Sequence, residues 1–244
     1  MQGLSEKSDC VLTFRHARAI IRFMECHIRG GTIHFEKAGT GAPLLLLHGN
    51  GESHEIFDRA VPLLAERFTV YALDTRGHGK SSPVAQFHYR DMAEDVLAFI
   101  RAQDLAHPVL YGFSDGGITA LLVGLTEPTL PACIVGSGVN VSPHGLTPAF
   151  LRDTRREWKQ TKNPLLELML HEPHICRHAL ARIRVPVYLT AGEFDLVLLQ
   201  HTLRIAQSIP NCTLRIFSGE THDSYVVHSP KIAEYLLDVL PQSF

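Results

Sequence analysis

Short apolar runs rich in β-branched residues alternate with longer stretches of helical periodicity from residue 25 onward. This alternation is typical of a parallel sheet whose strands are joined by helices. The predicted strands are Glu25–Ile28, Thr32–Lys37, Leu44–Leu47, Thr69–Leu73, Val109–Phe113, Cys133–Gly136, Pro186–Thr190 and Thr213–Phe217. The first two form an antiparallel hairpin at Gly30–Gly31, and the others run parallel, because the segments between them allow right-handed helical crossovers. The predicted fold class is α/β, with a mostly parallel eight-stranded sheet and helices on both faces.

Capping chemistry predicts two of the helices. Asp91 followed by Glu94 has the spacing of a capping box, which predicts a helix over about 91–103. Ser229 precedes Pro230, a cap ahead of a proline at the first helical position, which predicts a helix over about 230–240. Further helices are expected near 54–66, 115–126 and 196–208.

The segment between the strands ending near Gly136 and starting near Val185 has roughly 40 residues, which is long for a simple crossover. It contains Pro143, Pro148, Pro164 and Pro173. We predict an inserted small helical cap at about 140–182, within one domain that spans 24–244. Residues 1–23 lack regular patterning and are interpreted as an N-terminal tail or upstream extension, with Met24 as a candidate start; a docked amphipathic helix is the alternative.

Composition limits the partners. Lys plus Arg number 23 and Asp plus Glu 25, a formal charge of -2, which favours neither nucleic acid nor an anionic membrane as partner. The five cysteines are scattered without CxxC spacing, so we expect no disulfide framework or zinc site and a cytoplasmic location. No apolar run approaches the roughly 20 residues that span a bilayer. The expected partner is a small molecule, and a homodimer remains open.

The most specific motif is Gly112-Phe113-Ser114-Asp115-Gly116-Gly117, a G-x-S-x-G between a predicted strand and a predicted helix. A serine at such a turn projects its hydroxyl above the sheet, and the flanking glycines allow the backbone to fold back tightly. The helix N-terminus then stabilises negative charge on a carbonyl oxygen, with the N–H of Asp115 as one oxyanion donor. The motif therefore predicts Ser114 as a nucleophile.

The ordered set of motifs resembles the α/β-hydrolase family over nearly all of residues 25–244. The motifs are His48-Gly49-Asn50-Gly51, Asp74 to Ser81, Gly112 to Gly117, Gly192-Glu193-Phe194-Asp195 and Thr221-His222. The family carries its triad in the chain order serine, acid, histidine. The resemblance implies the α/β-hydrolase fold and a triad of Ser114, Asp195 and His222.

Alternatives exist for the acid. Glu193 is two residues from Asp195 and chemically competent, whereas Asp223 adjoins His222 in sequence and is poorly placed to contact its ring. By resemblance, the backbone N–H of Asn50 is the second oxyanion donor. We interpret His48 as an anchor of that loop by hydrogen bonds rather than as a catalytic residue. The segment Arg76 to Ser81 is expected to form a rigid loop near the site.

No cofactor or metal is predicted. Gly49-Asn50-Gly51 lacks the third glycine of a dinucleotide fingerprint, and Gly79-Lys80-Ser81 lacks the first glycine of a phosphate loop. His171, His174 and His178 have helical spacing, but Pro173 interrupts the segment, so we interpret them as a solvated cap face rather than metal ligands.

Two features bear on the substrate. Asp115 either pairs with a cationic group such as an amine or caps the following helix. The basic run Arg152, Arg155, Arg156, Lys159 and Lys162 either favours an anionic substrate or forms a solvated helix face. The predicted apolar lining of the site comprises Phe113, Phe150, Leu151 and Trp158.

The sequence thus predicts a serine hydrolase of the carboxylesterase type, which cleaves a small carboxylic ester or related acyl compound through an acyl-enzyme. The alternatives are a non-hydrolytic member of the fold (a lyase, a perhydrolase or cofactor-free haloperoxidase) or a C-C hydrolase, because fold alone does not decide the chemistry. A ligand-binding receptor without turnover is a third reading.

Overall fold

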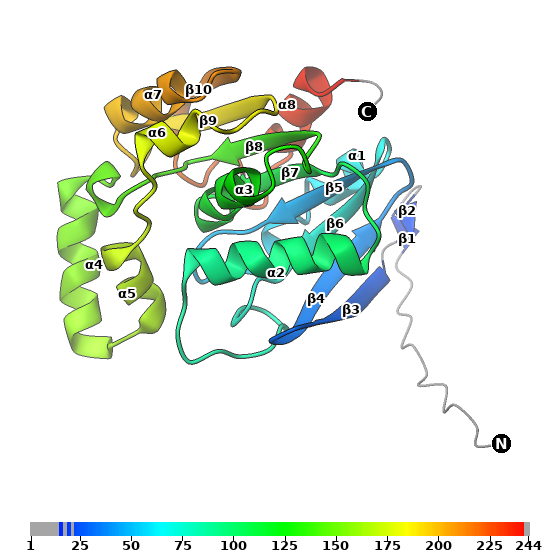
Figure 1. The fold of residues 1–244 in the computed structure, drawn as a ribbon, viewed down its shortest axis with the longest axis horizontal. Helices are drawn as coiled ribbons and strands as arrows, with labels where there is room; N and C mark the ends of the chain where they lie inside the picture. The colour runs from blue at the N-terminus through cyan, green and yellow to red at the C-terminus, as the bar shows by residue number, and fades with distance from the viewer. Residues whose placement is uncertain (1–14, 17–18, 21, 242–244) are drawn as a thin grey trace.

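An eight-stranded sheet forms the centre of this computed structural model, which describes residues 15–16, 19–20 and 22–241 (Figure 1). Its strand order is β10-β9-β8-β7-β5-β6-β4-β3. The strands are β3 (Arg22–Ile28), β4 (Gly31–Ala38), β5 (Ala42–Leu47), β6 (Phe68–Leu73), β7 (Val109–Phe113), β8 (Cys133–Ser137), β9 (Val187–Phe194) and β10 (Cys212–Thr221). β3 and β4 form the predicted antiparallel hairpin, β4 pairs antiparallel with β6, and the remaining pairs are parallel. The predicted α/β class and mostly parallel sheet are confirmed.

The central strands are aligned at their carboxyl ends. Leu47 of β5 pairs with Leu73 of β6 and with Gly112 of β7. The loops that follow these strands therefore meet at one edge of the sheet, where ligands bind in open α/β sheets. β5 has four consecutive buried leucines because both of its faces are covered.

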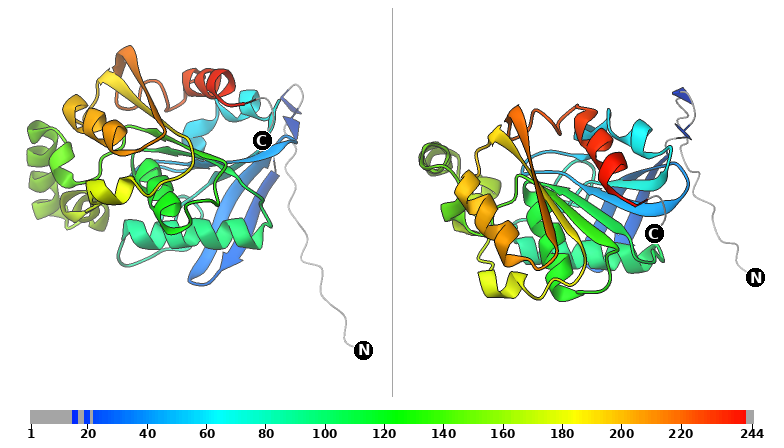
Figure 2. Two further views of the ribbon diagram at one scale, coloured as in Figure 1. Left: turned by 45° about the horizontal axis from the view of Figure 1, so that its top comes forward. Right: turned by 90° about the horizontal axis from the view of Figure 1, so that it is seen from above.

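Helices cover the two faces of the sheet, which the edge-on view in Figure 2 shows. On one face lie α1 (Val61–Leu64) and α8 (Lys231–Val239), and on the other α2 (Tyr89–Ala102), α3 (Asp115–Thr126) and α7 (Leu199–Ser208). Leu44 and Leu46 belong to the first apolar core, and Leu45 and Leu47 to the second. This alternation follows from the two-residue period of a strand.

Short helices fill the segment between β8 and β9. They are η2 (Pro143–Gly145), α4 (Pro148–Thr161), α5 (Pro164–His171) and α6 (Arg177–Leu180). The Thr147 hydroxyl accepts the N–H of Phe150 at the start of α4, and the Asn163 side chain accepts the N–H of Leu165 at the start of α5. α4 and α5 pack against each other at the left of Figure 1.

Two helix predictions are wrong in detail. The helix expected near 54–66 is a 3-10 turn, η1 (His54–Phe57), followed by the separate short α1. The capping box at Asp91 is not formed, because α2 begins earlier, with His88 as its N-cap. The Asp91 carboxylate instead accepts a hydrogen bond from Arg76 at 3.0 Å, so a tertiary ion pair replaces the local cap.

The chain ends differ from the predicted boundaries. Ser229 accepts the N–H of Lys231 at 3.3 Å, as a cap would, and α8 begins at Lys231. β3 begins at Arg22, which pairs with Lys37, so the central sheet starts two residues before Met24. A two-stranded antiparallel pair, β1 (Arg15–His16) with β2 (Ala19–Ile20), precedes it. The rest of the predicted tail lies outside the described residues.

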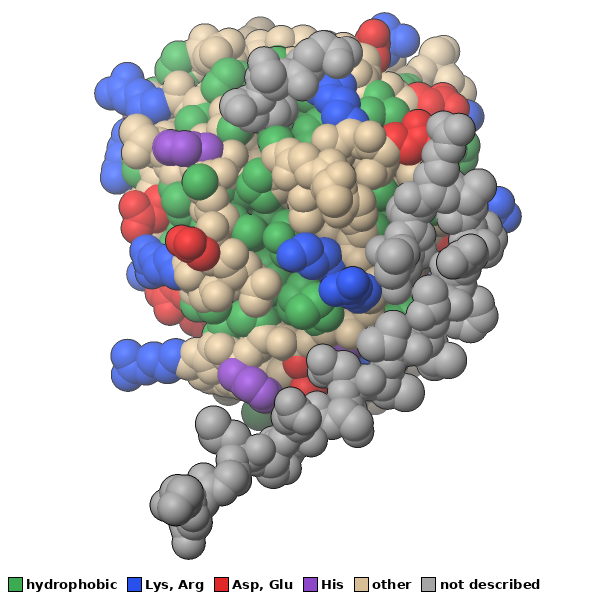
Figure 3. Space-filling model, turned by 90° about the vertical axis from the view of Figure 1, so that its right-hand side faces the viewer, with side chains coloured by type: hydrophobic (Ala, Val, Ile, Leu, Met, Phe, Trp, Pro, Cys, Tyr) green, Lys and Arg blue, Asp and Glu red, His purple; other side chains and the backbone are tan. Residues whose placement is uncertain are grey.

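The surface carries charges of both signs. Figure 3 views the molecule from the right-hand side of Figure 1, and basic and acidic side chains are interspersed over its described part. Cys26, Cys133, Cys176 and Cys212 are free thiols, and Cys10 lies outside the described residues. In the part of the chain that the structure describes, no helix is both long and apolar enough to cross a membrane.

Candidate active site

Ser114 lies at the junction between β7 and α3 with a strained backbone. Its φ of 51° and ψ of -113° are unusual for a non-glycine residue, and such conformations cost about 1–3 kcal/mol. Its N–H donates to the carbonyl of Ser137 at 2.8 Å, and its carbonyl accepts the N–H of Gly117 at 2.9 Å. The strain is thus held by β8 on one side and by α3 on the other.

The glycines around Ser114 are required by close backbone contacts. A Cβ on Gly112 would lie 2.1 Å from the carbonyl oxygen of Gly116, and a Cβ on Gly116 would lie 2.1 Å from that of Leu47. Any side chain at either position would force these backbones apart. The G-x-S-x-G pattern therefore follows from packing at the strand-to-helix turn.

His222 and Asp195 form a short pair at the ends of β10 and β9. His222 Nδ1 lies 2.6 Å from Asp195 Oδ1, and the side chain of Asp195 is only 3% exposed. The carboxylate also accepts the N–H groups of Gly192 and Val197 at 3.1 and 2.9 Å. The acid is therefore fixed in position by backbone donors, and Nε2 of the imidazole has no hydrogen-bond partner among the described residues.

The other candidate acids point elsewhere. Glu193 is exposed and accepts hydrogen bonds from Ser218 and from the N–H of Gly219, which lower the pKa of its carboxyl. The carboxylate of Asp223 accepts the hydroxyl of Thr221 at 2.8 Å.

The imidazole of His222 lies beside the residue that precedes Ser114. Its ring centroid is 5.0 Å from that of Phe113. A Cβ on Gly138, which has a φ of +61°, would lie 2.5 Å from Cε1 of His222. β7, β8 and β10 thus bring Ser114, Gly138 and His222 to the same edge of the sheet.

Two backbone N–H groups near Ser114 have no acceptor within the described part of the chain. They belong to Asn50, in the loop after β5, and to Asp115, the first residue of α3. The close approach of Gly116 to Leu47 brings the two loops together. This arrangement can stabilise an oxyanion.

Comparisons with known proteins identify the family of the chain. The sequence pattern described as alpha/beta hydrolase fold matches residues 42–162. Serine hydrolase BPHL of Homo sapiens is 30% identical over 201 residues, which cover 69% of this chain and 68% of the human protein. The chain belongs to the α/β hydrolase fold family. The resemblance inferred from the motifs is confirmed.

Solved structures share the fold of this α/β hydrolase. Carboxylesterase CesB of Bacillus subtilis superposes with a TM-score of 0.77 at 20% identity, covering 92% of this chain and 93% of that one. Est816, an N-acyl homoserine lactone degrading enzyme, superposes with a TM-score of 0.74 at 21% identity, and the match covers 89% of this chain and 100% of the Est816 chain. At such identities the likeness concerns the fold.

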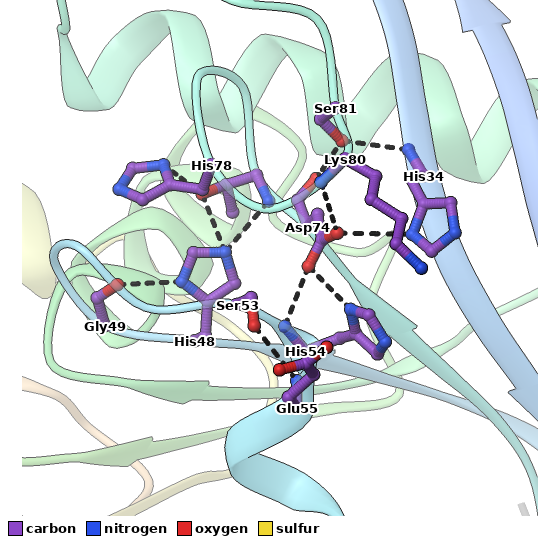
Figure 4. Close-up of polar contacts among 11 residues, drawn as sticks. His34, His48, Gly49, Ser53, His54, Glu55, Asp74, His78, Lys80 and Ser81 are labelled. Atoms are coloured by element: carbon purple, nitrogen blue, oxygen red, sulfur yellow. Dashed lines mark hydrogen bonds and ion pairs between the residues drawn. The ribbon is translucent and has the colours of Figure 1, made fainter.

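His48 anchors the loop that carries Asn50, as the sequence predicts. Its Nδ1 lies 2.7 Å from the carbonyl oxygen of Gly49, and its Nε2 accepts the N–H of Thr75 at 3.0 Å. Burial, with a smaller effect of the neighbouring His78, lowers the pKa of His48 to about 4. Figure 4 shows His48 between Gly49 and the loop that contains His78.

Glu52, in the same loop, is a site residue that the sequence did not predict. Its carboxylate accepts the N–H of Gly49 at 2.8 Å. Burial raises the pKa of Glu52 to about 7. The hydrogen bond from Gly49 and the charge of His222 lower this pKa, whereas the charge of Asp115 raises it further. The position of Glu52 only four residues after His48 was visible in the sequence, but its burial was not.

Asp115 does not cap α3 with its side chain, so the capping interpretation is wrong. Its carboxylate accepts the hydroxyl of Tyr89 at 2.6 Å and the Asn50 amide at 2.9 Å. That amide also donates to the carbonyl of Leu165 at 3.2 Å, which links the network to α5. Burial raises the pKa of Asp115, and no salt bridge reaches it within the described residues.

The predicted apolar lining is divided. Phe113 is buried beside His222. Phe150 is half-buried on α4. The ring of Trp158, also on α4, contacts His171 at the end of α5 and the ammonium of Lys162, which follows α4. The basic residues of α4, namely Arg152, Arg155, Arg156 and Lys159, are exposed, as is Lys162.

The histidines of the same segment are also exposed. His171 ends α5, His174 lies in the following turn and His178 belongs to α6, so they do not share one helix face. Cavities of about 420 and 360 Å³ lie along the seam between this segment and the sheet domain. They share His88 and Glu172, whose side chains are 2.6 Å apart, and neither is lined by Ser114 or His222.

Proposed function

We propose that this α/β hydrolase is a serine hydrolase that cleaves a small carboxylic ester or a related acyl compound through an acyl-enzyme. Ser114 is the nucleophile, His222 the general base and Asp195 the acid that orients His222. The observation that carries the proposal is the 2.6 Å contact of His222 with Asp195 beside Phe113, the residue before Ser114. The kinship with a protein named as a serine hydrolase supports it.

The proposed reaction begins when the Ser114 hydroxyl attacks the substrate carbonyl carbon and Nε2 of His222 takes its proton. Asp195, bound to Nδ1, stabilises the imidazolium. The tetrahedral intermediate collapses as His222 protonates the leaving alcohol, and water then releases the acid from the acyl-enzyme by the same route. The described hydrogen bonds include none between Ser114 and His222, a contact that commonly tightens with substrate.

The backbone N–H groups of Asn50 and Asp115 are the proposed oxyanion donors. Both lack an acceptor within the described residues. An N–H at the start of α3 also benefits from the partial positive charge of the helix terminus. Loss of one such donor commonly costs a factor of about 10²–10³ in kcat.

The negative charge of Asp115 favours substrates that carry an amino group near the carbonyl. Its carboxylate is held by two neutral donors, Tyr89 and Asn50, and lies next to the proposed nucleophile in the chain. A cationic group would compensate the buried charge. An anionic substrate would find no equivalent buried partner on α4, because the basic residues of this helix are exposed.

The test is hydrolysis of p-nitrophenyl esters of graded acyl length by the wild type, Ser114→Ala and Ser218→Ala. Ser218 is an exposed serine and provides the matched control. Activity and fluorophosphonate labelling that persist in Ser218→Ala and vanish in Ser114→Ala are expected. Labelling without ester turnover would instead favour a narrow specificity or a related chemistry, and the absence of both would favour a receptor.

A further inference from the structure

Three side chains outside the proposed triad meet in a buried cluster. His34 lies on β4, His54 begins η1 and Asp74 follows β6. Their side chains are 7%, 4% and 0% exposed. His34 Nδ1 lies 3.2 Å from Asp74 Oδ2, and His54 Nδ1 lies 2.7 Å from Asp74 Oδ1. Figure 4 shows both imidazoles directed at the one carboxylate.

We propose that His34, His54 and Asp74 bind one divalent transition-metal ion of the zinc class. Potential ligand atoms of the three residues lie within 4.8 Å of one another. Zinc bonds of about 2.0–2.1 Å to nitrogen and oxygen place the ligand atoms of a tetrahedron about 3.3 Å apart. His54 Nδ1 lies 2.7 Å from one oxygen of the Asp74 carboxylate and His34 Nδ1 lies 3.2 Å from the other, so a shift of these side chains would bring three ligand atoms around one ion.

The donor set selects the kind of metal. Two imidazole nitrogens and one carboxylate oxygen suit zinc, cobalt or nickel, whereas magnesium and calcium prefer oxygen ligands alone. Each neutral imidazole presents Nδ1 as a ligand when its single proton is on Nε2. The ion then replaces the two contacts between imidazole and carboxylate with bonds to itself.

Asp74 is oriented by the backbone in advance. Its Oδ1 accepts the N–H of His54 at 2.8 Å, and its Oδ2 accepts the N–H of Lys80 at 2.9 Å. The strand that carries His34 is held by a bond of 2.8 Å from the His34 N–H to the Ser81 hydroxyl. Such outer hydrogen bonds fix metal ligands in productive orientations.

Glu36 is a second feature that points to a cation. It follows His34 by two residues on β4 and therefore faces the same side of the strand. It is 8% exposed, and its carboxylate has no hydrogen bond to any described residue. Among the described residues it is therefore an acidic side chain without a hydrogen-bond partner on the side of β4 that carries His34.

Phe23 covers the cluster on its solvent side. Its ring centroid lies 6.0 Å from that of His34 and 5.9 Å from that of His54, and Phe23 is 43% exposed. The ammonium of Lys80 lies over this ring at 5.3 Å and is the nearby cation that opposes a metal. Rotation of one half-exposed side chain would therefore open an access route to the site.

The proposed site is independent of the triad. It joins β4 and the end of β6 to the far end of the loop that begins at His48. A metal that binds only the folded chain raises its stability by mass action. Zinc binding and the melting temperature consequently report on the site whether or not the protein hydrolyses esters.

The experiment uses the tag-free full chain after treatment with EDTA. Titration calorimetry with Zn²⁺ is expected to give one ion per chain and a higher melting temperature. Loss of a ligand in His34→Gln or His54→Gln should weaken zinc binding by more than the 10–100-fold typical of an outer-shell change. The control is Cys176→Ser with His178→Gln, because these exposed side chains, 3.8 Å apart, are a second group of possible zinc ligands.

Equal zinc binding by the wild type and both histidine variants would overturn the proposal. It would also be overturned if the wild type bound no zinc, or if only the Cys176/His178 control lost zinc binding. Circular dichroism establishes whether each variant is folded. If both histidine variants unfold, X-ray absorption of the zinc-loaded wild type decides. Two imidazoles with only nitrogen and oxygen ligands would support the site, and a sulfur ligand would reject it.

Discussion

The Tyr89 hydroxyl donates a hydrogen bond of 2.6 Å to Asp115, and so ties the start of α2 to the residue after Ser114. Asp115 is 5% exposed, and burial raises the pKa of its carboxyl. Its other oxygen accepts the Asn50 amide. Two neutral donors thus hold a buried acid beside the proposed nucleophile, where the proposed amino substrate would supply a positive charge that no described residue supplies in a salt bridge.

Asp115→Asn tests this preference for amino substrates. We expect kcat/KM to fall at least about tenfold more on an α-amino ester than on the neutral ester of the same size, because a partly buried charge pair is lost. Steady-state kinetics on the matched esters measures the difference. Tyr89→Phe keeps the charge and serves as control; equal losses on both esters in Asp115→Asn would refute the preference.

Asp195→Asn is expected to lower kcat by about 10³–10⁴-fold, because an amide no longer stabilises the imidazolium or its tautomer. Glu193→Gln alters the nearby exposed acid and is expected to leave kcat unchanged. Both variants are assayed on the ester that the wild type hydrolyses fastest. A large loss in Glu193→Gln with none in Asp195→Asn would reverse the assignment of the acid.

Gly138→Ala is expected to displace His222, since a Cβ there would lie 2.5 Å from the ring. Gly219→Ala is the matched control, because Gly219 also has a positive φ, +76°, but no atom lies within 4 Å of the added Cβ. The backbone cost of about 1 kcal/mol is then similar in both variants. Thermal melts should show similar destabilisation, and only Gly138→Ala should lose most of its esterase activity. Equal activities would show that His222 tolerates the contact.

Glu52→Ala is expected to lower kcat about tenfold, because the freed N–H of Gly49 loosens the loop that carries Asn50. Glu52→Gln keeps an acceptor oxygen and should retain most activity. The kinetic constants of the two variants on a neutral ester distinguish a role in positioning from a need for charge. If Gln is as damaging as Ala, the charge itself matters.

The buried imidazole of His48 makes the free energy of unfolding depend on pH between about 4 and 6.5. Its pKa in the folded chain is about 4, below the ordinary value of about 6.5, so between these values the unfolded chain binds a proton that the folded chain does not. The contribution of neutral His48 is complete above pH 6.5 and is lost as the pH falls toward 4. It amounts to about 3 kcal/mol.

Urea unfolding in EDTA between pH 7 and 4 measures this contribution. His48→Gln should be less stable at pH 7 and should lose less stability on acidification than the wild type. The difference between the two curves isolates His48 from the carboxylates that titrate in the same range. Parallel curves would mean that His48 does not titrate abnormally.

Local signals in the sequence predicted much of the fold. The strand Val109–Phe113 and the helix from Asp115 have the predicted bounds, because the turn at Ser114 tolerates only small neighbours. The helix at 54–66 was wrong because its first residues are bound by tertiary contacts, with the N–H of His54 donating to Asp74. The capping box at Asp91 failed because Arg76 takes the carboxylate.

Long-range pairings account for what the sequence did not predict. The partners of Asp74 are 40 and 20 residues away, and the local pattern of a strand or a turn does not show which distant side chains will meet. Tyr89 reaches Asp115 across 26 residues in the same manner. The assignment of Ser114, Asp195 and His222 remains a prediction that rests on motif order and on the geometry at one edge of the sheet.

The chain leaves the sheet at the end of β8 and returns on β9, its immediate neighbour in the strand order. The helices α4 and α5, which lie between the two, are therefore a detour that no strand pair depends on. A change in the length of α4 or α5 therefore leaves the order of the strands that carry Ser114 and His222 unchanged. The hydrogen bond from the Asn50 amide to the carbonyl of Leu165 is the contact through which such a change would reach the site.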